Sequence, residues 1–453
     1  MHMTKTIRIG AGSAWWGDRI EPAALNAEQG NLDYLCFETM AEATISAAQV
    51  RKRREPGFPG YDTYLDDRMQ AVLPACLRRG TKIVTNQGWI NPEGAAQRIV
   101  HWLRHFGARG IKVAAISGGL ITDRVLELTD TILENGKPTA TLADSLVSAE
   151  VYLGAEPIVD ALKQGARIVV SGRVADPSIF MAPMMYEFDW DPLDHRRLGQ
   201  GNGVGHLMEC GAQVTGGYFA DPGFKDVPEP WNLAFPIVEA EPDGSVVLTK
   251  VAGTGGAVDL RTVKEQILYE VHDPANYITP DVVVDFTTAK LEQVGPDRVR
   301  VTGISGRPRT ATLKVSIGCT EGFIGEDMFF YAEPGALRRA QLAKRILEER
   351  FRIVGLEAEE LRIDFLGLNA IHGEMTPRNQ PEPYEIAVRV AARTKTREEA
   401  IKVGREVDGM AVSGVGMTGK RVPHQERTRE IIGVWSSLVE REKIRSTMTF
   451  YES

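Results

Sequence analysis

The sequence predicts an α/β protein with a parallel β-sheet and flanking helices, doubly wound or alternatively closed as a barrel. β-Hairpins and a ferredoxin-like α+β domain follow. Two observations predict the first part: short β-branched runs alternate with helical periodicity, and the runs end in turns rich in Gly, Ser and Asn. Strands separated by helices pair in parallel. Because 453 residues exceed what one core usually supports, we expect two domains, 1–305 and 306–453.

The first half justifies this prediction element by element. Asn91 before Pro92 is typical of a helix start, because Asn caps free N–H groups and Pro fits the first turn. The patterns predict helices over residues 40–52, 64–79, 94–106 and 157–164. They predict strands over residues 7–10, 32–37, 82–85, 111–116, 140–143 and 168–170.

From about Pro222 the pattern changes to hairpins and then to an α+β order. Turns at residues 242–244 and 295–297 separate strands over residues 235–239, 245–250, 282–291 and 298–303, with a helix from Thr262 to Glu270. After residue 306 the order strand, helix, strand, strand, helix, strand predicts the ferredoxin-like domain. Its helices span residues 335–351 and 396–408, and its strands span residues 312–317, 328–332, 361–366, 384–391 and 431–438.

Composition and charge exclude several classes of function. A net charge of −8 and a pI near 5.7 argue against nucleic-acid or membrane-surface partners, which need excess Lys and Arg. No apolar run is long enough to span a membrane, and no apolar signal segment precedes the first strand. The four cysteines show no paired spacing, which indicates reduced thiols. We therefore expect a cytoplasmic protein.

Polar residues at the ends of the strands are the first candidates for a site. In parallel sheets, and equally at the rim of a barrel, ligands bind where the carboxyl ends of the strands converge. The alternative is that these side chains only cap helices or close turns. The candidates are Ser13, Asp18, Arg19, Glu38, Asn86, Glu93, Ser117, Ser145, Ser171, Arg173 and Asp176.

Residues 167–217 hold the densest group of reactive side chains. Arg173, like Arg19, can bind a carboxylate or phosphate through two hydrogen bonds. Asp176 and Glu209 can form an acid/base pair, one with its pKa raised by burial and the other kept ionised by an arginine. Gln213 follows as a candidate binding residue. This pair favours a hydro-lyase or isomerase that acts beside a carboxylate or thioester and needs no cofactor.

Two other interpretations of this stretch remain open. Cys210 could be a nucleophile beside His206, although a lone Cys on an apolar helix is more often part of the core. His206 and Glu209, three residues apart, could be metal ligands, but no third ligand is identifiable. His372 and His424 stand alone in loops, so we expect structural roles for both.

Glycine-rich turns point to anions more than to dinucleotides. The turn GAGSAWWG lacks the GxGxxG spacing, and neither a Walker A motif nor a GxSxG motif is present. The run Gly253–Gly256 precedes a helix, an arrangement that can bind anions with Thr254 and Lys264 as candidate contacts. A flexible linker between hairpins is the alternative.

Several blocks in collinear order carry a resemblance that covers nearly the whole chain. They are IRIGAGSAWWGDR, TNQGWINPEGAAQRI, SGRVADPSIFMAP, GHLMECGAQVTGG, GTGGAVDLRTVKEQILYEVHDP and TPDVVVDFT. Together they resemble the AtuA family of acyclic terpene utilisation proteins. The resemblance implies catabolism of branched organic acids alongside acyl-CoA enzymes. The resemblance also implies that many relatives end in an extra small ferredoxin-like domain; we expect this chain to lack it after Ser453 and a separate small subunit to supply it.

These observations predict an acid/base hydratase, dehydratase or isomerase that acts on a small branched organic acid or its CoA thioester. The catalytic candidates are Asp176, Glu209 and Cys210, and we expect a homo-oligomer. The alternatives are a non-catalytic subunit for acyl-CoA binding or assembly, and a metal-dependent hydratase. The expected substrate-binding residues are Ser13, Asp18, Arg19, Asn86, Glu93, Ser117, Arg173, Gln213, Thr254 and Lys264.

Overall fold

The computed structural model describes residues 5–377, 379, 381–421 and 427–453, so His424 lies outside the described residues. Contacts divide the chain into two compact units, Met1–Gly318 with Val434–Ser453, and Cys319–Gly433. The sequence patterns place one boundary at residues 305 and 306 instead. Two long strands, β14 (Thr312–Ala332) and β18 (Thr428–Glu440), contribute residues to both units.

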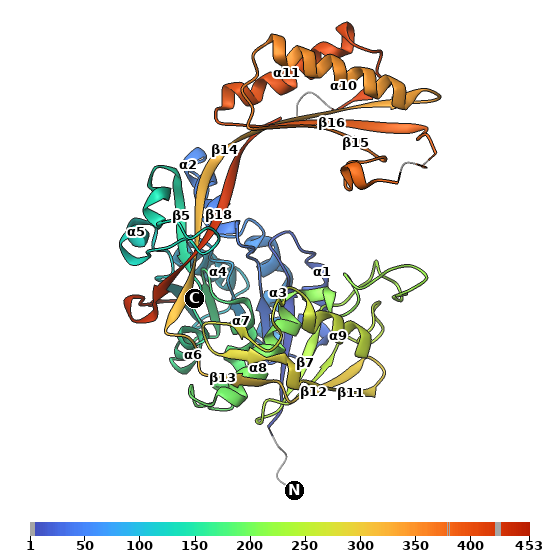
Figure 1. Cartoon of the computed structure of the whole chain (residues 1–453). Coiled ribbons are helices and arrows are strands. Elements are labelled where there is room, and N and C mark those ends of the chain that lie inside the picture. Colours follow the sequence, from blue (N-terminus) through green and yellow to red (C-terminus); the bar gives the residue numbers. More distant parts are fainter. Residues whose placement is uncertain (1–4, 378, 380, 422–426) are drawn as a thin grey trace. The chain divides into compact units, whose positions relative to one another are not determined.

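A ten-stranded mixed sheet is the framework of the first unit (Figure 1). Five central strands pair in parallel in the order β1 (Ile7–Ser13), β2 (Tyr34–Phe37), β3 (Lys82–Thr85), β6 (Ile168–Ser171) and β4 (Lys112–Ser117). Every residue of β2 and β6 is buried, as expected for strands covered on both faces.

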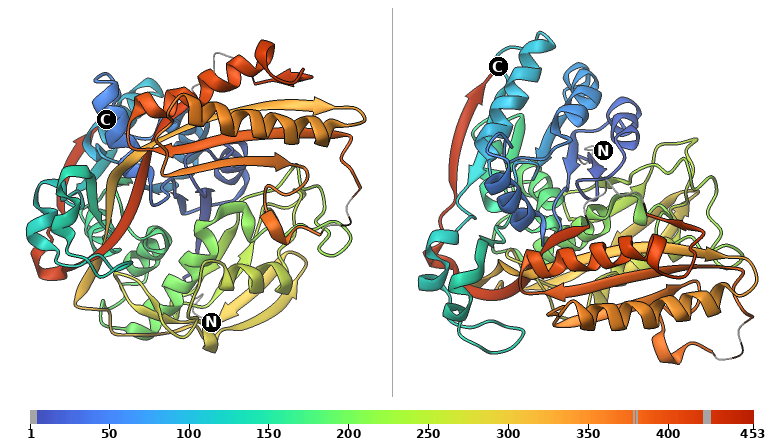
Figure 2. Two further views of the ribbon diagram at one scale, coloured as in Figure 1. Left: turned by 45° about the horizontal axis from the view of Figure 1, so that its top comes forward. Right: turned by 90° about the horizontal axis from the view of Figure 1, so that it is seen from above.

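Antiparallel strands extend this sheet on both sides. Beyond β1 lie β7 (Ile237–Ala240), β8 (Val246–Thr249), β12 (Arg298–Thr302) and β11 (Lys290–Gly295), and beyond β4 lies β19 (Thr447–Glu452). In Figure 2 β19 is the red strand at the carboxyl end of the chain. Within the described part of the chain β11 and β19 are the two edges of this sheet, so the sheet is open, which excludes the barrel alternative. A separate three-stranded sheet contains β13 (Ser305–Arg307), β10 (Val283–Asp285) and β9 (Tyr277–Ile278).

The helices of the first unit pack mainly in two series. One contains α1 (Glu21–Gln29), α3 (Leu65–Arg79) and α4 (Pro92–His105), and the other contains α6 (Glu156–Lys163), α7 (Asp176–Glu187) and α8 (His195–Glu209). The remaining helices are α2 (Thr44–Arg54), α5 (Val125–Leu128) and α9 (Leu260–Leu268). Helix α4 begins as the sequence predicts, with the Asn91 side chain accepting a hydrogen bond from the Gly94 N–H.

Several predicted strands are wrong in detail. Residues 312–317 and 328–332, predicted as two strands, belong to one continuous strand, β14. Residues 140–143 lie in a 3₁₀ segment, Thr139–Ser145, because Pro138 precedes it and Thr141 Oγ donates to the Pro138 carbonyl; the strand, β5 (Leu146–Val151), comes later and pairs with β14. Residues 282–291 divide into β10 and β11 because the Asp285 carboxylate accepts the Thr287 N–H and turns the chain.

The second unit has its own antiparallel sheet, in the order β15 (Glu360–Leu366), β16 (Glu385–Thr394), β14 and β17 (Gly419–Lys420). Helices α10 (Ala336–Ile353) and α11 (Arg397–Ser413) lie side by side on one face of it (Figures 1 and 2). Their apolar stripes pack on Phe329, Val388 and Val390 to form a separate core. Among the described residues, no helix combines the length and apolar character that crossing a bilayer requires.

Candidate functional site

A buried arginine lies at the centre of the candidate site. Strand β6 ends at Ser171, and Arg173 follows in the turn before α7. The guanidinium donates to the Ala41 carbonyl at 2.7 Å and the Asp176 carboxylate at 3.2 Å, and its Nε lies 3.7 Å from Glu150 Oε1. Its charge also lies 4.7 Å from the centroid of the Tyr152 ring. The guanidinium therefore faces protein groups that compensate its charge and fix its position.

Several carboxyl groups lie near the Arg173 guanidinium, and its single positive charge cannot balance all of them. Burial raises the pKa of Glu150 to about 8 and outweighs the opposing effect of Arg173. Burial and the charge of Asp176 raise the pKa of Glu38 well above its usual value. Burial also raises the pKa of Asp176, but only to about 6, because Arg173 favours the ionised form. At neutral pH Asp176 is therefore the ionised member of this group.

Glu209, the last residue of α8, forms a hydrogen bond with a buried histidine. Its Oε1 lies 2.8 Å from His206 Nδ1, and His206 Nε2 lies 3.0 Å from the Gln266 carbonyl. A carbonyl only accepts, so Nε2 carries a proton. Burial lowers the pKa of His206 to about 4, which leaves Nδ1 as an acceptor at neutral pH. Glu209 must then donate as a protonated acid, consistent with a pKa raised by burial and by the Asp176 charge.

The two carboxyl groups with different protonation states share one cavity. Asp176 and Glu209 line a cavity of about 730 Å³ within the first unit. Glu209 Oε2 has no hydrogen-bond partner among the described residues, whereas Oε1 is held by His206. The volume is in the usual range for small-molecule sites. The other lining residues include Glu42, Tyr152, Glu270, His272, Tyr277, Ile278, Leu313, Lys314 and Leu438.

Glycines in α8 allow the two carboxyl-bearing helices to approach closely. A Cβ at Gly205 would lie 2.3 Å from the Pro177 carbonyl oxygen, and Pro177 is the neighbour of Asp176. A Cβ at Gly199 would lie 2.4 Å from the Ser305 backbone. Gly costs helix stability, about 1 kcal/mol relative to Ala, so this sequence accepts a weaker helix in exchange for close packing. The consequence is that the end of α8 lies beside the start of α7.

Other residues predicted at the strand ends are engaged in polar contacts near β1 to β3. Ser13 Oγ donates to the Glu38 carbonyl, and Asn86 Nδ2 donates to the Glu38 carboxyl at 3.0 Å. Asp18 accepts the N–H groups of Ala14 and Arg19 at 2.8 Å, closing its own loop. These contacts bring Ser13 and Asn86 together around Glu38, which lies close enough to Asp176 for their charges to interact.

The remaining predicted residues lie in different places. Glu93, in the first turn of α4, accepts from Thr449, and Ser117 lines a smaller cavity of about 170 Å³ with Arg173 and Glu150. Arg19 donates to the Trp231 carbonyl, and Thr254 accepts from Lys250. Lys264 is exposed on α9. Gln213 closes a 3₁₀ turn after α8, and its buried Oε1 lacks a partner among the described residues.

Two other interpretations concern Cys210 as a nucleophile and His206 with Glu209 as metal ligands. Burial raises the pKa of Cys210, so the group is a thiol at neutral pH and not the thiolate that a nucleophile requires. Both ring nitrogens of His206 are hydrogen-bonded within the protein. Among the described residues, no group of three or more His, Cys, Asp or Glu side chains is arranged to hold a metal ion.

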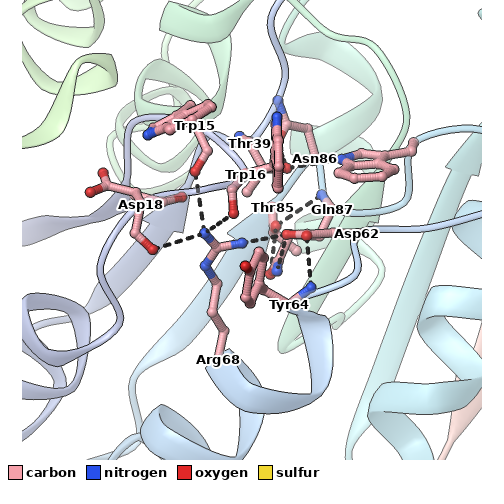
Figure 3. Close-up of polar contacts among 12 residues, drawn as sticks. Trp15, Trp16, Asp18, Thr39, Asp62, Tyr64, Arg68, Thr85, Asn86 and Gln87 are labelled. Carbon is pink, nitrogen blue, oxygen red and sulfur yellow. Dashed lines mark hydrogen bonds and ion pairs between the residues drawn. The ribbon is translucent and has the colours of Figure 1, made fainter. Parts of the chain in front are cut away.

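A second buried ion pair supports the loop after β1 and was missed by the sequence analysis (Figure 3). Arg68 and Asp62 form an ion pair with fully buried side chains. Arg68 Nη2 also donates to the carbonyls of Trp16 at 2.7 Å and Trp15 at 3.2 Å. Gln87 donates to Asp62 at 2.9 Å. An Arg and an Asp six residues apart look like an ordinary exposed helix start, so no sequence signal distinguishes this pair.

Three residues of the main cavity, Tyr152, Tyr277 and Lys314, were also missed, as was Glu150 of the smaller cavity. Tyr152 lies between two cations, with Lys314 5.1 Å and Arg173 4.7 Å from its ring centroid. Burial raises the pKa of Tyr152 to about 12 and keeps it neutral. Tyr152 and Lys314 come from segments far apart in the chain, and only the folded arrangement shows that they meet.

Comparison with known protein families gives a match over nearly the whole chain. The family described as "Acyclic terpene utilisation family protein AtuA" matches residues 7–450. No curated protein matches the chain by sequence.

The Asp62–Arg68 pair predicts a large loss of stability on substitution. Asp62→Ala leaves a fully buried guanidinium without its carboxylate, and breaking such a pair costs about 3–5 kcal/mol. Glu28→Ala breaks the exposed pair with Arg78, which should cost at most about 1 kcal/mol. Urea unfolding of the two variants measures the difference, and equal losses would contradict the assigned role of the buried pair.

The raised pKa of Glu150 predicts how the stability of the protein depends on pH. Its folded pKa is raised from 4.5 to about 8, so in this interval the folded protein retains a proton that the unfolded chain has lost. The stabilisation from this proton is complete below the unfolded pKa and is lost as the pH rises through about 8. Glu150→Gln, which is always neutral, should therefore lose less unfolding free energy between about pH 5 and 9 than the wild type. Glu349→Gln, an exposed substitution on α10, is the control and should keep the wild-type slope.

Proposed function

This chain belongs to the AtuA family of acyclic terpene utilisation proteins, and we propose that it is an acid/base lyase or isomerase. The proposed reaction is hydration, dehydration or double-bond migration in a branched organic acid or its CoA thioester. One observation carries the proposal: the shared cavity presents an ionised Asp176 and a protonated Glu209 at neutral pH. Two groups whose environments give them different protonation states are suited to act as base and acid.

The proposed chemistry assigns one proton transfer to each carboxyl group. In a dehydration, the Asp176 carboxylate takes a proton from the carbon next to the carbonyl, and the electron pair forms the double bond. The carbon–oxygen bond breaks, and Glu209 protonates the leaving hydroxyl, so the product is water. In an isomerisation, Glu209 delivers its proton to carbon instead. Both reactions require only that the substrate replaces His206 as the acceptor of the Glu209 proton.

Other residues have binding or positioning roles in this proposal. Ile278, Leu313 and Leu438 supply apolar surface for a branched chain. Lys314, exposed on β14, is the cation of the cavity available to a carboxylate or thioester oxygen. Arg173 is a positioning residue, because its donors face carbonyls and carboxylates of the protein. His206 likewise positions Glu209 and is too weakly basic at its pKa of about 4 to be the base at neutral pH.

The finer assignments of the fold are part of the same proposal. The chain order of the second unit and its antiparallel sheet order, β15-β16-β14-β17, support a ferredoxin-like module. Such modules often mediate assembly, so we assign homo-oligomerisation to this unit. In the strand order β2-β3-β6-β4 the chain moves outward from β3 to β4 and then back to β6. This reversal of direction supports a doubly wound core.

Substitution of the two carboxyl groups tests the proposed reaction. Glu209→Gln and Asp176→Asn should each lower kcat by about 10²–10⁴-fold, because each removes one proton transfer while preserving size. Turnover of branched hydroxy and unsaturated acyl-CoA thioesters, and of their free acids, is followed by mass spectrometry. Glu349→Gln is the control. Wild-type-like turnover in either catalytic variant would contradict the mechanism; absence of turnover in the wild type, with binding retained, would favour a non-catalytic subunit.

The pH profile gives an independent test. The base must be ionised, so kcat/KM should fall as the pH decreases through about 6, the pKa of Asp176. The charge of Lys314 lowers this pKa. Lys314→Gln should therefore move the acidic limb to higher pH, whatever its effect on substrate binding. Lys163→Gln, an exposed substitution on α6, should leave the limb in place. An acidic limb that stays fixed in Lys314→Gln would exclude Asp176 as the titrating base.

A further inference from the structure

A second recess shares a wall with the acid/base cavity. It is a shallow, open recess of about 700 Å³ between residues 219–225 and helix α9, and Glu270 lines both spaces. We propose that this recess binds the nucleotide of a CoA thioester while the acyl group occupies the acid/base cavity across Glu270. The inference rests on the proposed function and selects the thioester over the free acid as the substrate class.

The clustered cations of the recess support a phosphate-bearing ligand. Lys225, Arg261 and Lys264 line it, against the carboxylates of Glu265 and Glu270. A third carboxylate, that of Asp259, pairs with Arg261, so the recess clusters three cations without a net excess of positive charge. Phosphate oxygens bind Lys and Arg through charge-assisted hydrogen bonds, roughly twice as strong as neutral ones. A free organic acid needs no such cluster beyond the reacting cavity.

The three cations differ in what already binds them. Lys225 forms an ion pair with Glu265, and Arg261 forms one with Asp259 at 2.7 Å. Among the described residues no ion-pair partner is found for the Lys264 ammonium, which is exposed on the same face of α9 as Leu268. Lys264 is therefore the cation with its donors most available to a phosphate.

Aromatic and apolar side chains beside these cations supply a surface for a base. The ring of Phe219 has Lys225 4.9 Å and Arg261 5.5 Å from its centroid. Phe224 is 85% exposed, although it lines the same recess. Aromatic rings stack on nucleobases whatever the base, and adjacent cations bind the attached phosphates. Phe219 is itself buried, so its ring holds the two cations in place, and the exposed ring of Phe224 is the surface available for stacking with a base.

The backbone at the shared wall adds a further observation. Glu270 has φ +58°, a left-handed conformation that is uncommon for a residue with a side chain. Such conformations cost free energy and cluster at binding sites. Here the chain leaves α9 and continues to His272 and Tyr277, which line the acid/base cavity.

Calorimetry with the full chain tests the recess directly, with adenosine 3′,5′-bisphosphate as the probe. Wild-type protein should bind it, and Lys264→Gln and Arg261→Gln should each raise Kd by about tenfold, the effect of losing one charge-assisted hydrogen bond. Lys163→Gln, which removes an exposed lysine on α6, should bind like the wild type. Wild-type binding no tighter than that of inorganic phosphate, or unchanged Kd in both recess variants, would overturn the inference.

Kinetics separate this inference from the proposed function. Lys264→Gln should raise KM for a CoA thioester by about tenfold with kcat within about twofold. The KM for the N-acetylcysteamine thioester of the same acid, which lacks the nucleotide, should stay unchanged. Bisphosphate binding without turnover of any substrate would reject the catalytic proposal and keep the recess. Turnover of the free acid as efficient as that of the thioester, with no effect of Lys264→Gln, would reject the recess and keep the catalytic proposal.

Discussion

The site depends on the cost of burying one guanidinium. Taking Arg173 out of water is expensive unless carbonyls and carboxylates surround it, and the structure supplies the carbonyls of Met40 and Ala41 with Glu150 and Asp176. The same carboxyl groups cannot all be ionised near one cation. Their pKa values therefore separate, with Asp176 at about 6 and Glu150 at about 8. Burial thus raises the pKa of both carboxyl groups, and the Arg173 charge keeps Asp176, the proposed base, ionised at neutral pH.

The second buried guanidinium, that of Arg68, has a different structural role. Arg68 donates to the carbonyls of Trp15 and Trp16 in the loop after β1, where the Trp15 carbonyl also accepts the Asp18 N–H. Buried carbonyls without donors are costly, and one planar cation can satisfy several of them. The loop after β1 can therefore hold two partly exposed tryptophans, 48% and 37% accessible, in fixed positions. Both arginines act at the carboxyl ends of parallel strands, where loops are dense and backbone pairing is incomplete.

Local patterns in the sequence predicted most of the elements, and the misses have physical causes. Helix α4 was predictable because Asn91 and Pro92 act within one turn. Strand β19 was missed because its partner β4 lies more than 300 residues earlier, and its alternating exposure resembles that of any edge segment. The return of Val434–Ser453 to the first unit was missed for the same reason. The candidates Asp176, Glu209 and Arg173 came from the density of reactive side chains in residues 167–217, a local signal. No local signal marks Lys314 and Tyr152, because these residues are far apart in the sequence and meet only in the folded chain.

The glycines of α8 explain why that dense segment becomes a site at all. A sequence such as GQGNGVGH is poor for a helix, yet α8 runs unbroken through it from His195 to Glu209. What compensates is packing: at Gly205 the helix touches the Pro177 backbone, at a distance that any Cβ would prevent. This contact joins the carboxyl end of α8, with Glu209, to the amino end of α7, with Asp176. A side chain at position 205 would separate the two carboxyl groups before it altered either of them. The geometry between acid and base is therefore encoded by a residue that has no side chain to contribute.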